Sequence, residues 1–336
     1  MQALELAAIG GDGPRLVELP RPEPAAGQLR VALRAAALNH RELFILQGQY
    51  PGMALPCTLG ADGAGIVDAV GDGVPQARIG ERVVLYPGMD WGDDQRFPGR
   101  GFHLLGMPAP GTIAEHICVP AGSARPMPPH LDFAQAAALP TAALTAWRGL
   151  TAKAALQPGE TLLITGIGGG VATYALLFGR AMGARVYVTS SRADTIARAV
   201  DLGAEAGFDY RDKDWHKAFL KASGGADVVF DGAPAGSMRA YTRALRMGAR
   251  IVVYGSTGGV EAGFLAPSLF LSHATIHGTA MGSPADFAGM LEFVAAKGLA
   301  PVIDRRFALT QAPQALEYLR DGHAFGKVVI DIPGEN

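Results

Sequence analysis

Residues 161–192 read TLLITGIGGGVATYALLFGRAMGARVYVTSSR, and this stretch decides the fold. An apolar run at 161–165 has the length of a strand buried on both faces, and a glycine-rich segment follows it at 166–170. Small residues from 171 to about 182 indicate a helix, and residues 184–189 read as a second buried strand. Parallel strands need such a crossover connection, so the stretch predicts a βαβ unit.

The glycine-rich segment indicates a dinucleotide site. Glycines allow a sharp turn and a close approach to a pyrophosphate, whose charge faces the free N–H groups at the helix start. Two registers of the fingerprint fit: one ends on Val171, and the other, through Gly166 and Gly169, ends on Ala172, which is the better small residue. A purely structural turn is the alternative. The residues expected to contact the cofactor here are Gly166, Gly168, Gly169, Gly170 and Val171.

Composition excludes several classes of protein. The length of 336 residues favours two domains, and 49% hydrophobic with 18% charged residues predicts folded cores. A net charge of −2 and the lack of a basic run exclude a nucleic-acid partner. We find no signal peptide, no apolar run long enough to span a membrane and only two cysteines, Cys57 and Cys118. The sequence therefore predicts a cytoplasmic protein with no membrane partner.

The order of the expected elements predicts an α/β protein. Short strands at 28–34, 63–70 and 81–85 indicate a β-rich first domain, followed by a long loop at 86–110 of the kind that is often functional. Asp132 and Gln135 form a helix-capping pair, and a further helix is expected at 141–150 after Pro140. Strands at 226–231, 248–254 and 274–280, with a helix at 237–246, extend the βαβ unit into a doubly wound parallel sheet. Helices at 286–297 and 312–320 and strands at 301–307 and 327–332 complete the chain.

Several motifs together resemble the medium-chain dehydrogenase/reductase superfamily over almost the whole chain. They are LGADGAGIV at 59–67 with Val70-Gly71, Leu139-Pro140 with Thr145-Ala146-Trp147, Pro158-Gly159, the glycine turn and Gly326-Lys327-Val328-Val329. The resemblance implies a GroES-like domain at 1–124, a Rossmann domain at 125–281 and a return segment at 282–336 that completes the first domain. It also implies an active site in the cleft between the domains.

The zinc ligands of that superfamily are missing from this chain. The resemblance places Asn39, Ala61 and Ala142 at the Cys, His and Cys ligands of the catalytic zinc, and alanine has no donor atom. The loop at 86–110, where the structural zinc would be bound, contains no cysteine. We therefore expect no zinc. LNHREL at 38–43 and GQYP at 48–51 are similar to the zinc-free branch that contains the quinone oxidoreductases.

The end of the second strand favours NADPH over NADH. Ser190, Ser191 and Arg192 stand where NAD enzymes carry an acidic residue, and an arginine without a repelling carboxylate suits a 2′-phosphate. Alternatively, Arg192 points to solvent, and Tyr210 is either an adenosine contact or a surface residue. The resemblance adds further cofactor contacts from Thr145, Tyr254, Gly255, Ser256, Thr279, Ala280, Met281, Phe325 and Lys327.

Without a metal, hydrogen-bond donors must polarise the substrate, and conjugated acceptors suit such a site. By resemblance, Tyr50 is the candidate proton donor and Asn39 a contact to substrate or nicotinamide ribose, while His40 could join a proton relay. A packing role for Tyr50, a turn role for Asn39 and a surface role for His40 are the alternatives.

Other side chains receive supporting roles. Trp91 and His103 are expected to line the substrate pocket, and Asp62 is expected to be a buried carboxylate paired with a cation. The two cysteines are expected to be buried apolar residues rather than nucleophiles.

Three functions remain open at this point. The first is an NADPH-dependent, zinc-independent reductase of quinones or other activated carbonyl or alkene acceptors. The second is a zinc-free alcohol or aldehyde dehydrogenase, and the third is a non-catalytic NADPH-binding sensor or scaffold. The resemblance also implies a homodimer joined at a sheet edge. Neither the physiological substrate nor the direction of the reaction follows from the sequence.

Overall fold

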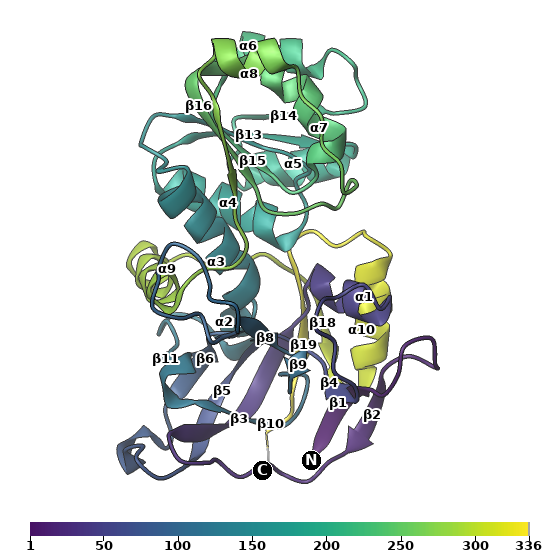
Figure 1. Cartoon of the computed structure of the whole chain (residues 1–336), viewed down its shortest axis with the longest axis vertical. Helices are drawn as coiled ribbons and strands as arrows, with labels where there is room; N and C mark the ends of the chain where they lie inside the picture. Colours follow the sequence, from purple (N-terminus) through teal and green to yellow (C-terminus); the bar gives the residue numbers. More distant parts are fainter. Residues whose placement is uncertain (335–336) are drawn as a thin grey trace. The chain divides into compact units, whose positions relative to one another are not determined.

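The computed structural model describes residues 1–334, whose contacts divide the chain into two units (Figure 1). Unit 2 comprises Thr145–Met281, drawn in teal and green. Unit 1 comprises Met1–Leu144 and the chain from Gly282 onward. The last segment of the chain therefore returns to the unit in which the chain begins.

Unit 2 is built on a six-stranded sheet in which all neighbouring strands are parallel. The strand order is β14-β13-β12-β15-β16-β17, so successive strands run outward from β12 first to one side and then to the other. The predicted α/β class and doubly wound sheet are confirmed. The strands are β12 (Thr161–Ile164), β13 (Arg185–Ser190), β14 (Ala206–Asp209), β15 (Ala226–Asp231), β16 (Leu245–Val253) and β17 (Thr275–Gly278).

Helices connect these strands, as parallel pairing requires. Helix α4 packs closely on β12, because a side chain at Gly179 would come within 2.7 Å of Leu162. The helices of unit 2 are α4 (Gly170–Ala181), α5 (Ala193–Asp201), α6 (Trp215–Ser223), α7 (Pro234–Tyr241) and α8 (Ala266–Leu271), with the short π-helix η3 (Gly149–Lys153) and the short 3-10 helix η4 (Thr242–Ala244). Helix α3 (Pro140–Arg148) contains the boundary at 144/145.

Unit 1 is β-rich, as predicted. Its largest sheet has the order β11-β6-β5-β3-β19-β18, and β10 also pairs with β3. The C-terminal strand β19 runs antiparallel to β3, which places the return segment next to the N-terminal strands. The strands of this sheet are β3 (Gln28–Ala37), β5 (Asp62–Val70), β6 (Arg82–Leu85), β10 (His116–Pro120), β11 (Ala124–Pro126), β18 (Ile303–Ala308) and β19 (Lys327–Asp331).

Two small sheets and several short helices complete unit 1. The small sheets are formed by β1 (Gln2–Leu6), β2 (Arg15–Glu18) and β4 (Cys57–Thr58), and by β7 (Gly88–Met89), β8 (His103–Leu105) and β9 (Pro108–Ala109). The helices are α1 (His40–Leu46), α2 (Phe133–Ala137), α9 (Pro284–Lys297) and α10 (Ala312–Arg320), with the turns η1 (Gln76–Arg78), η2 (Ala121–Ser123) and η5 (Leu309–Gln311).

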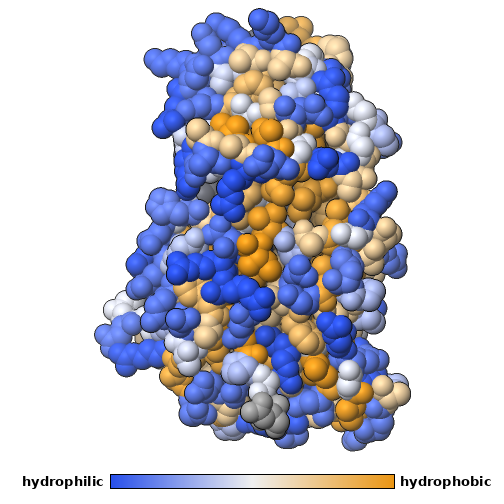
Figure 2. All heavy atoms as spheres, turned by 180° about the vertical axis from the view of Figure 1, so that it is seen from behind, coloured by the Kyte–Doolittle hydropathy of each residue, from blue (hydrophilic) through white to orange (hydrophobic). Residues whose placement is uncertain are grey.

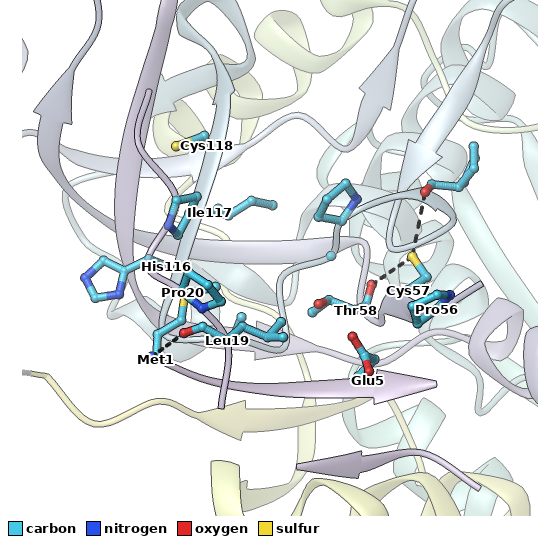
Figure 3. A pocket seen from close by; sticks show the side chains of 15 residues that line it. Met1, Glu5, Leu19, Pro20, Pro56, Cys57, Thr58, His116, Ile117 and Cys118 are labelled. Atoms are coloured by element: carbon cyan, nitrogen blue, oxygen red, sulfur yellow. Dashed lines mark hydrogen bonds between the residues drawn. The ribbon is translucent and has the colours of Figure 1, made fainter. Parts of the chain in front are cut away.

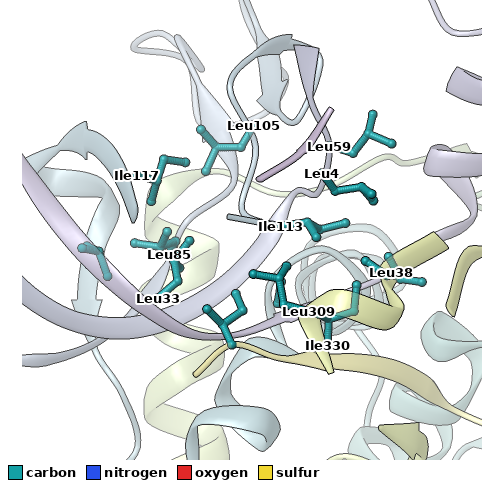
Figure 4. Close-up of a cluster of buried hydrophobic side chains, with 14 of the residues drawn as sticks. Leu4, Leu33, Leu38, Leu59, Leu85, Leu105, Ile113, Ile117, Leu309 and Ile330 are labelled. Atoms are coloured by element: carbon teal, nitrogen blue, oxygen red, sulfur yellow. The ribbon is translucent and has the colours of Figure 1, made fainter. Parts of the chain in front are cut away.

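The core of unit 1 joins residues from both ends of the chain. Leu4, Leu33, Leu59, Ile113 and Ile330 are fully buried in one apolar cluster, and Figure 4 shows these side chains together. Burying such side chains is the main favourable contribution to folding. On the outside, hydrophilic residues cover much of the surface, and apolar residues remain exposed in patches between them (Figure 2).

Some boundaries differ from those expected. Residues 125–144, assigned from the sequence to the Rossmann domain, pack with unit 1 because β11 pairs with β6 and α2 lies against β3 and β5. The helix expected at 237–246 ends as α7 at Tyr241, because Leu245 pairs with Ala226 and begins β16. The capping pair is confirmed: Asp132 Oδ1 accepts from the Gln135 N–H over 2.7 Å. None of the helices within residues 1–334 is long and apolar enough to cross a membrane.

Candidate active site

Asn39 precedes helix α1, and both ends of its carboxamide are hydrogen-bonded. Its Nδ2 donates to Asp62 Oδ2 over 2.9 Å, and its Oδ1 accepts from Lys327 Nζ over 2.6 Å. Its backbone N–H donates to Glu42 Oε2 over 2.7 Å, which fixes the start of the helix. Partners on β5 and β19 therefore set the orientation of this side chain.

Lys327 is a buried cation at the start of β19. Its side chain is 3% exposed, and its Nζ donates to Leu38 O over 2.7 Å, to Asn39 Oδ1 and to Asp62 Oδ2 over 3.0 Å. An ammonium group has three donors, so each of them has an acceptor here. We expected Lys327 to contact the cofactor; its ammonium instead binds three oxygens of unit 1, and a cofactor contact stays a prediction.

Asp62 accepts four hydrogen bonds although its side chain is fully buried. The Thr141 N–H and Oγ1 donate to its Oδ1 over 2.9 and 2.6 Å, while Asn39 and Lys327 donate to its Oδ2. A buried ion pair is tolerated when its remaining lone pairs are satisfied in this way. The expectation that Asp62 is a buried carboxylate paired with a cation is confirmed. Asn39, Asp62, Thr141 and Lys327 together are called the Lys327 cluster below.

The side chains at the family's zinc positions do not fit a zinc ion. Ala61 and Ala142 are buried and have no donor atom, and the carboxamide of Asn39 is bound to Asp62 and Lys327. Among the described residues, no three His, Cys, Asp or Glu side chains lie where they could hold a metal.

Tyr50 lies against a buried arginine that the sequence did not indicate. The Arg41 guanidinium carbon is 4.7 Å from the centroid of the Tyr50 ring, and Arg41 Nε donates to the Tyr50 hydroxyl over 3.3 Å. Arg41 also donates to Glu42 Oε1 and to the carbonyl oxygen of Leu105. Because the Tyr50 hydroxyl accepts from Arg41, its own hydrogen remains available for donation to a substrate oxygen.

Two titratable groups next to this arrangement have shifted pKa values. Burial raises the pKa of Glu42, whose side chain is fully buried, and the adjacent Arg41 partly opposes that shift. Desolvation, and then the Lys327 charge, lowers the pKa of His40, although part of its surface stays exposed. The lowered pKa favours the neutral form of the His40 imidazole.

In unit 2, the glycine turn between β12 and α4 needs glycine at two positions. Gly166 and Gly168 have φ values of +63° and +139°, which other residues rarely adopt. The Gly166 N–H donates to Thr189 Oγ1 over 3.1 Å, which ties the turn to the end of β13. A Cβ built at Gly166 or Gly169 meets nothing within 4 Å, so the turn has open space beside it. Gly170 and Val171 follow as the first residues of α4.

Beneath this turn, the ends of β12 and β15 are joined by buried polar groups. Asp231 is fully buried and accepts from Thr165 Oγ1, from Ser237 Oγ over 2.7 Å and from the Ala233 N–H over 2.8 Å. Thr165 immediately precedes Gly166, so Asp231 fixes the residue at which the turn begins. The contact was not predicted from the sequence, although Thr165 stands directly before the glycines and Asp231 ends a buried strand.

Several of the other expected nicotinamide contacts follow strand ends of unit 2, whereas Thr145 lies in helix α3 and Phe325 lies in unit 1. Tyr254 follows β16 and stacks on Phe230 with ring centroids 4.5 Å apart, and burial raises the pKa of Tyr254. The Thr279 hydroxyl, after β17, is buried without a hydrogen-bond partner among the described residues, and Met281 has a φ of +58°. Their roles stay predictions, as do those of Thr145, Gly255, Ser256, Ala280 and Phe325; Thr145 and Phe325 are buried, and Ser256 and Ala280 are exposed.

A carboxylate in the first turn of helix α5 lies beside Arg192, shortly after the end of β13. Ser190 Oγ accepts from the Arg192 N–H over 3.2 Å, and Ser191 is half-buried. Arg192 Nη2 lies 2.6 Å from Asp194 Oδ2, so the statement that no carboxylate is present near Arg192 is wrong. Helix α5 begins at Ala193, which places Asp194 beside the guanidinium, and this pairing lowers the pKa of Asp194. Tyr210 follows β14 and is 47% exposed.

The loop at 86–110 is packed around one of its own side chains. Trp91 is 3% exposed, its Nε1–H donates to Asp94 O over 2.9 Å, and its ring meets Phe102 edge to face. His103 begins β8, and its Nδ1 lies 2.9 Å from Gly101 O. These contacts stabilise the loop, and the expected contacts of Trp91 and His103 with substrate stay predictions.

A separate cavity of about 380 Å³ in unit 1 is lined by both cysteines and several prolines (Figure 3). None of the expected site residues lines it. Burial raises the pKa of each thiol to about 11, and Cys57 Sγ lies 3.4 Å from the carbonyl oxygens of Thr58 and Ala109. Thiols of this kind are protonated at neutral pH. Cys57 is buried as expected, whereas Cys118 is only partly buried, and the expectation that neither is a nucleophile stays a prediction.

Comparison with known proteins places these two units in one family. Residues 25–129 match the model for the alcohol dehydrogenase GroES-like domain, and residues 170–296 match the model for zinc-binding dehydrogenases. A zinc-type alcohol dehydrogenase-like protein, YogA, of Leptosphaeria maculans is 36% identical over 93% of this chain and 92% of its own length. The chain belongs to the medium-chain dehydrogenase/reductase superfamily.

Other members agree in sequence and fold. A zinc-type alcohol dehydrogenase-like protein of Schizosaccharomyces pombe is 32% identical over 91% of both chains. The crystal structure of an NAD-dependent alcohol dehydrogenase is 34% identical, covers 99% of this chain and 100% of its own, and superposes with a TM-score of 0.93. The chain is therefore a medium-chain dehydrogenase/reductase enzyme, an oxidoreductase that uses a nicotinamide cofactor.

Proposed function

We propose that this medium-chain dehydrogenase/reductase is an NADPH-dependent, zinc-independent reductase of quinones or other conjugated carbonyl or alkene acceptors. The observation that carries the proposal is the Lys327 cluster. The four side chains of this cluster are joined to one another by hydrogen bonds. One of them is Asn39, which the resemblance places at the family's first zinc position. Because these side chains do not fit a metal that could ionise a saturated alcohol, they favour a conjugated acceptor, which spreads the charge that hydride addition creates.

The side chains of unit 1 supply the remaining chemistry. The reduced nicotinamide supplies the hydride. Tyr50 donates the proton of its hydroxyl to the substrate oxygen or carbon that gains electron density, and a proton from solvent restores the phenol. The Arg41 guanidinium, 3.3 Å from that hydroxyl, stabilises the negative charge left on it. Asn39, fixed by Asp62 and Lys327, orients the bound molecule through its remaining N–H.

Ser190 and Arg192 support NADPH as the cofactor. A serine ends β13 in place of a carboxylate, and the Arg192 guanidinium is 42% exposed beside it. Guanidinium groups bind phosphate through charge-assisted hydrogen bonds. NADH is the alternative, since one similar structure is described as NAD-dependent.

A zinc-free alcohol or aldehyde dehydrogenase is the second candidate function. It is favoured by the names of several relatives, among them an NAD-dependent alcohol dehydrogenase of Saccharolobus solfataricus that is 28% identical over 98% of this chain. In that reaction a base must remove the alcohol proton. His40 is the candidate base, because its lowered pKa favours the neutral imidazole, which can accept a proton.

We also propose a homodimer and a cytoplasmic location. Strand β17 ends the sheet of unit 2, and an edge strand can pair with the same strand of a second copy. Both cysteines are free thiols, which suits a reducing compartment.

Titration of the purified protein with NADPH and NADH tests the proposal, followed by turnover of quinones, enones, aldehydes and alcohols with and without a chelator. We expect tighter binding of NADPH and turnover of a conjugated acceptor that the chelator does not change. One bound zinc per chain, with alcohol oxidation that the chelator abolishes, would overturn the zinc-independent reductase. Tight NADPH binding without turnover of any acceptor would instead indicate a sensor or scaffold.

A further inference from the structure

Two arginines follow the ends of neighbouring parallel strands in unit 2. Strands β13 and β14 pair in a register whose last partners are Ser190 and Asp209. Arg192 comes two residues after the first of these, and Arg211 two residues after the second. Because neighbouring strands lie about 4.8 Å apart, the two segments that carry these arginines leave the sheet next to each other at its carboxyl edge. In sheets of this topology, ligands bind outside that edge.

Each guanidinium is exposed and is held by an aspartate two residues away. Arg192 Nη2 lies 2.6 Å from Asp194 Oδ2, and Arg211 Nη2 lies 2.6 Å from Asp209 Oδ2. The two arginine side chains are 42% and 67% exposed. Exposed pairs of this kind contribute little to stability, so a better anion can replace either carboxylate at small cost.

Part of the Arg211 guanidinium remains available to donate hydrogen bonds to such an anion. Its Nε and Nη2 donate to Asp209, and its Nη1 donates to no residue of the described chain. The bond to Arg211 lowers the pKa of Asp209, so the carboxylate is ionised at neutral pH and holds the arginine beside the strand end. Tyr210 precedes it and is half-exposed.

We propose that Arg211 is a second residue that determines cofactor specificity, binding the 2′-phosphate of NADPH together with Arg192. This inference rests on the proposed preference for NADPH. A phosphomonoester carries close to two negative charges at pH 7, and the two guanidinium groups match that charge. A single guanidinium would leave about half of that charge uncompensated. Asp194 and Asp209 hold the two arginines in place and repel the anion, so they limit the affinity for NADPH.

Binding of 2′,5′-ADP and of 5′-AMP, measured by isothermal titration calorimetry, isolates this contact because the two probes differ in the 2′-phosphate. In the Arg211→Ala protein we expect 2′,5′-ADP to bind about tenfold or more weakly, because a charge-assisted hydrogen bond is lost, with 5′-AMP affinity unchanged. Arg192→Ala is expected to behave similarly, and the double variant should not distinguish the probes. Asp209→Asn should strengthen 2′,5′-ADP binding, since it removes a repelling charge.

Arg96→Ala is the matched control. Arg96 pairs with Asp94 two residues earlier, as Arg211 does with Asp209, but lies in unit 1. Its removal should change neither affinity. Unchanged 2′,5′-ADP binding in Arg211→Ala, while the unsubstituted protein distinguishes the probes, would overturn the role of Arg211 and leave the NADPH preference standing. An unsubstituted protein that binds both probes equally would overturn both proposals.

Discussion

The ammonium of Lys327 lies 3.0 Å from the carboxylate of Asp62, although 265 residues separate them in the chain. The contact is possible because β19 pairs with one side of β3 and β5 pairs with the other. Ala37, at the end of β3, pairs with Asp62 on one side and with Val329 on the other. The ion pair between Asp62 and Lys327 therefore crosses the end of β3. The pair thus joins the return segment to the N-terminal part of unit 1 at the candidate active site.

Substitution of Lys327 by methionine should strongly destabilise the protein. It would leave Asp62 buried without a cation, and removing one partner of a buried pair costs about 3–5 kcal/mol. The measurement is the free energy of unfolding from urea denaturation. Adding Asp62→Asn to the variant should recover part of the loss, because the uncompensated charge disappears. Lys217→Met is the control, since the Lys217–Asp214 pair is exposed. A loss for Lys327→Met no larger than for the control would contradict this account.

Replacement of Tyr50 by phenylalanine should lower kcat on a conjugated acceptor by roughly 10²-fold or more, the usual contribution of a positioned acid. The KM for NADPH should change little, because the hydroxyl is assigned to the proton transfer. Steady-state kinetics with a good acceptor provide the test. Tyr318→Phe serves as the control, since it also removes a hydroxyl that is hydrogen-bonded, here to Asp304 over 2.6 Å. Unchanged kinetics in Tyr50→Phe would make Tyr50 a packing residue.

His40 should titrate below its ordinary value of 6.5, because desolvation and the Lys327 charge lower its pKa. The unfolded chain then binds the proton more readily than the folded chain between the two values. The stability contribution of His40 is therefore present above pH 6.5 and is lost as the pH falls through the lowered pKa. Proton NMR of the imidazole, assigned by comparison with His40→Gln, measures the titration. A midpoint at or above 6.5 would contradict the lowered pKa of His40.

The sequence predicted the sheet of unit 2 well, because buried strands and glycine turns are local patterns. Each of the strands expected at 161–165, 184–189 and 226–231 lies within one or two residues of its place in the structure. Helix α1 was missed, since its seven residues are too few to show helical periodicity. The strand order in the main sheet of unit 1 does not follow from local patterns either, because this sheet joins strands from both ends of the chain.

The sequence predicted several residues of the candidate site but not the contacts that they make with one another. Asn39, Tyr50 and Asp62 were identified, but the partners Lys327 and Arg41 were not assigned to them. Lys327 comes from a distant segment, and no local pattern gives its register against β3. Asp194 is only two residues from Arg192. It was not predicted as a partner because the dinucleotide fingerprint concerns the residue that ends the strand, whereas Asp194 lies in the first turn of the following helix.

Substitution of Ile276 by lysine should weaken the proposed homodimer. Ile276 lies on the edge strand β17 and is 41% exposed, and other apolar residues nearby in the chain, Phe270 and Leu271, are more than 60% exposed. In a two-fold interface each substitution occurs twice, so like charges would face each other and the dissociation constant should rise at least about tenfold. Analytical ultracentrifugation over a range of concentrations measures it. Ile9→Lys is the matched control, because Ile9 is 42% exposed but lies in unit 1. If the unsubstituted protein is a monomer at every concentration, β17 is not an interface. If the Ile276→Lys variant dimerises with unchanged affinity, the interface lies elsewhere.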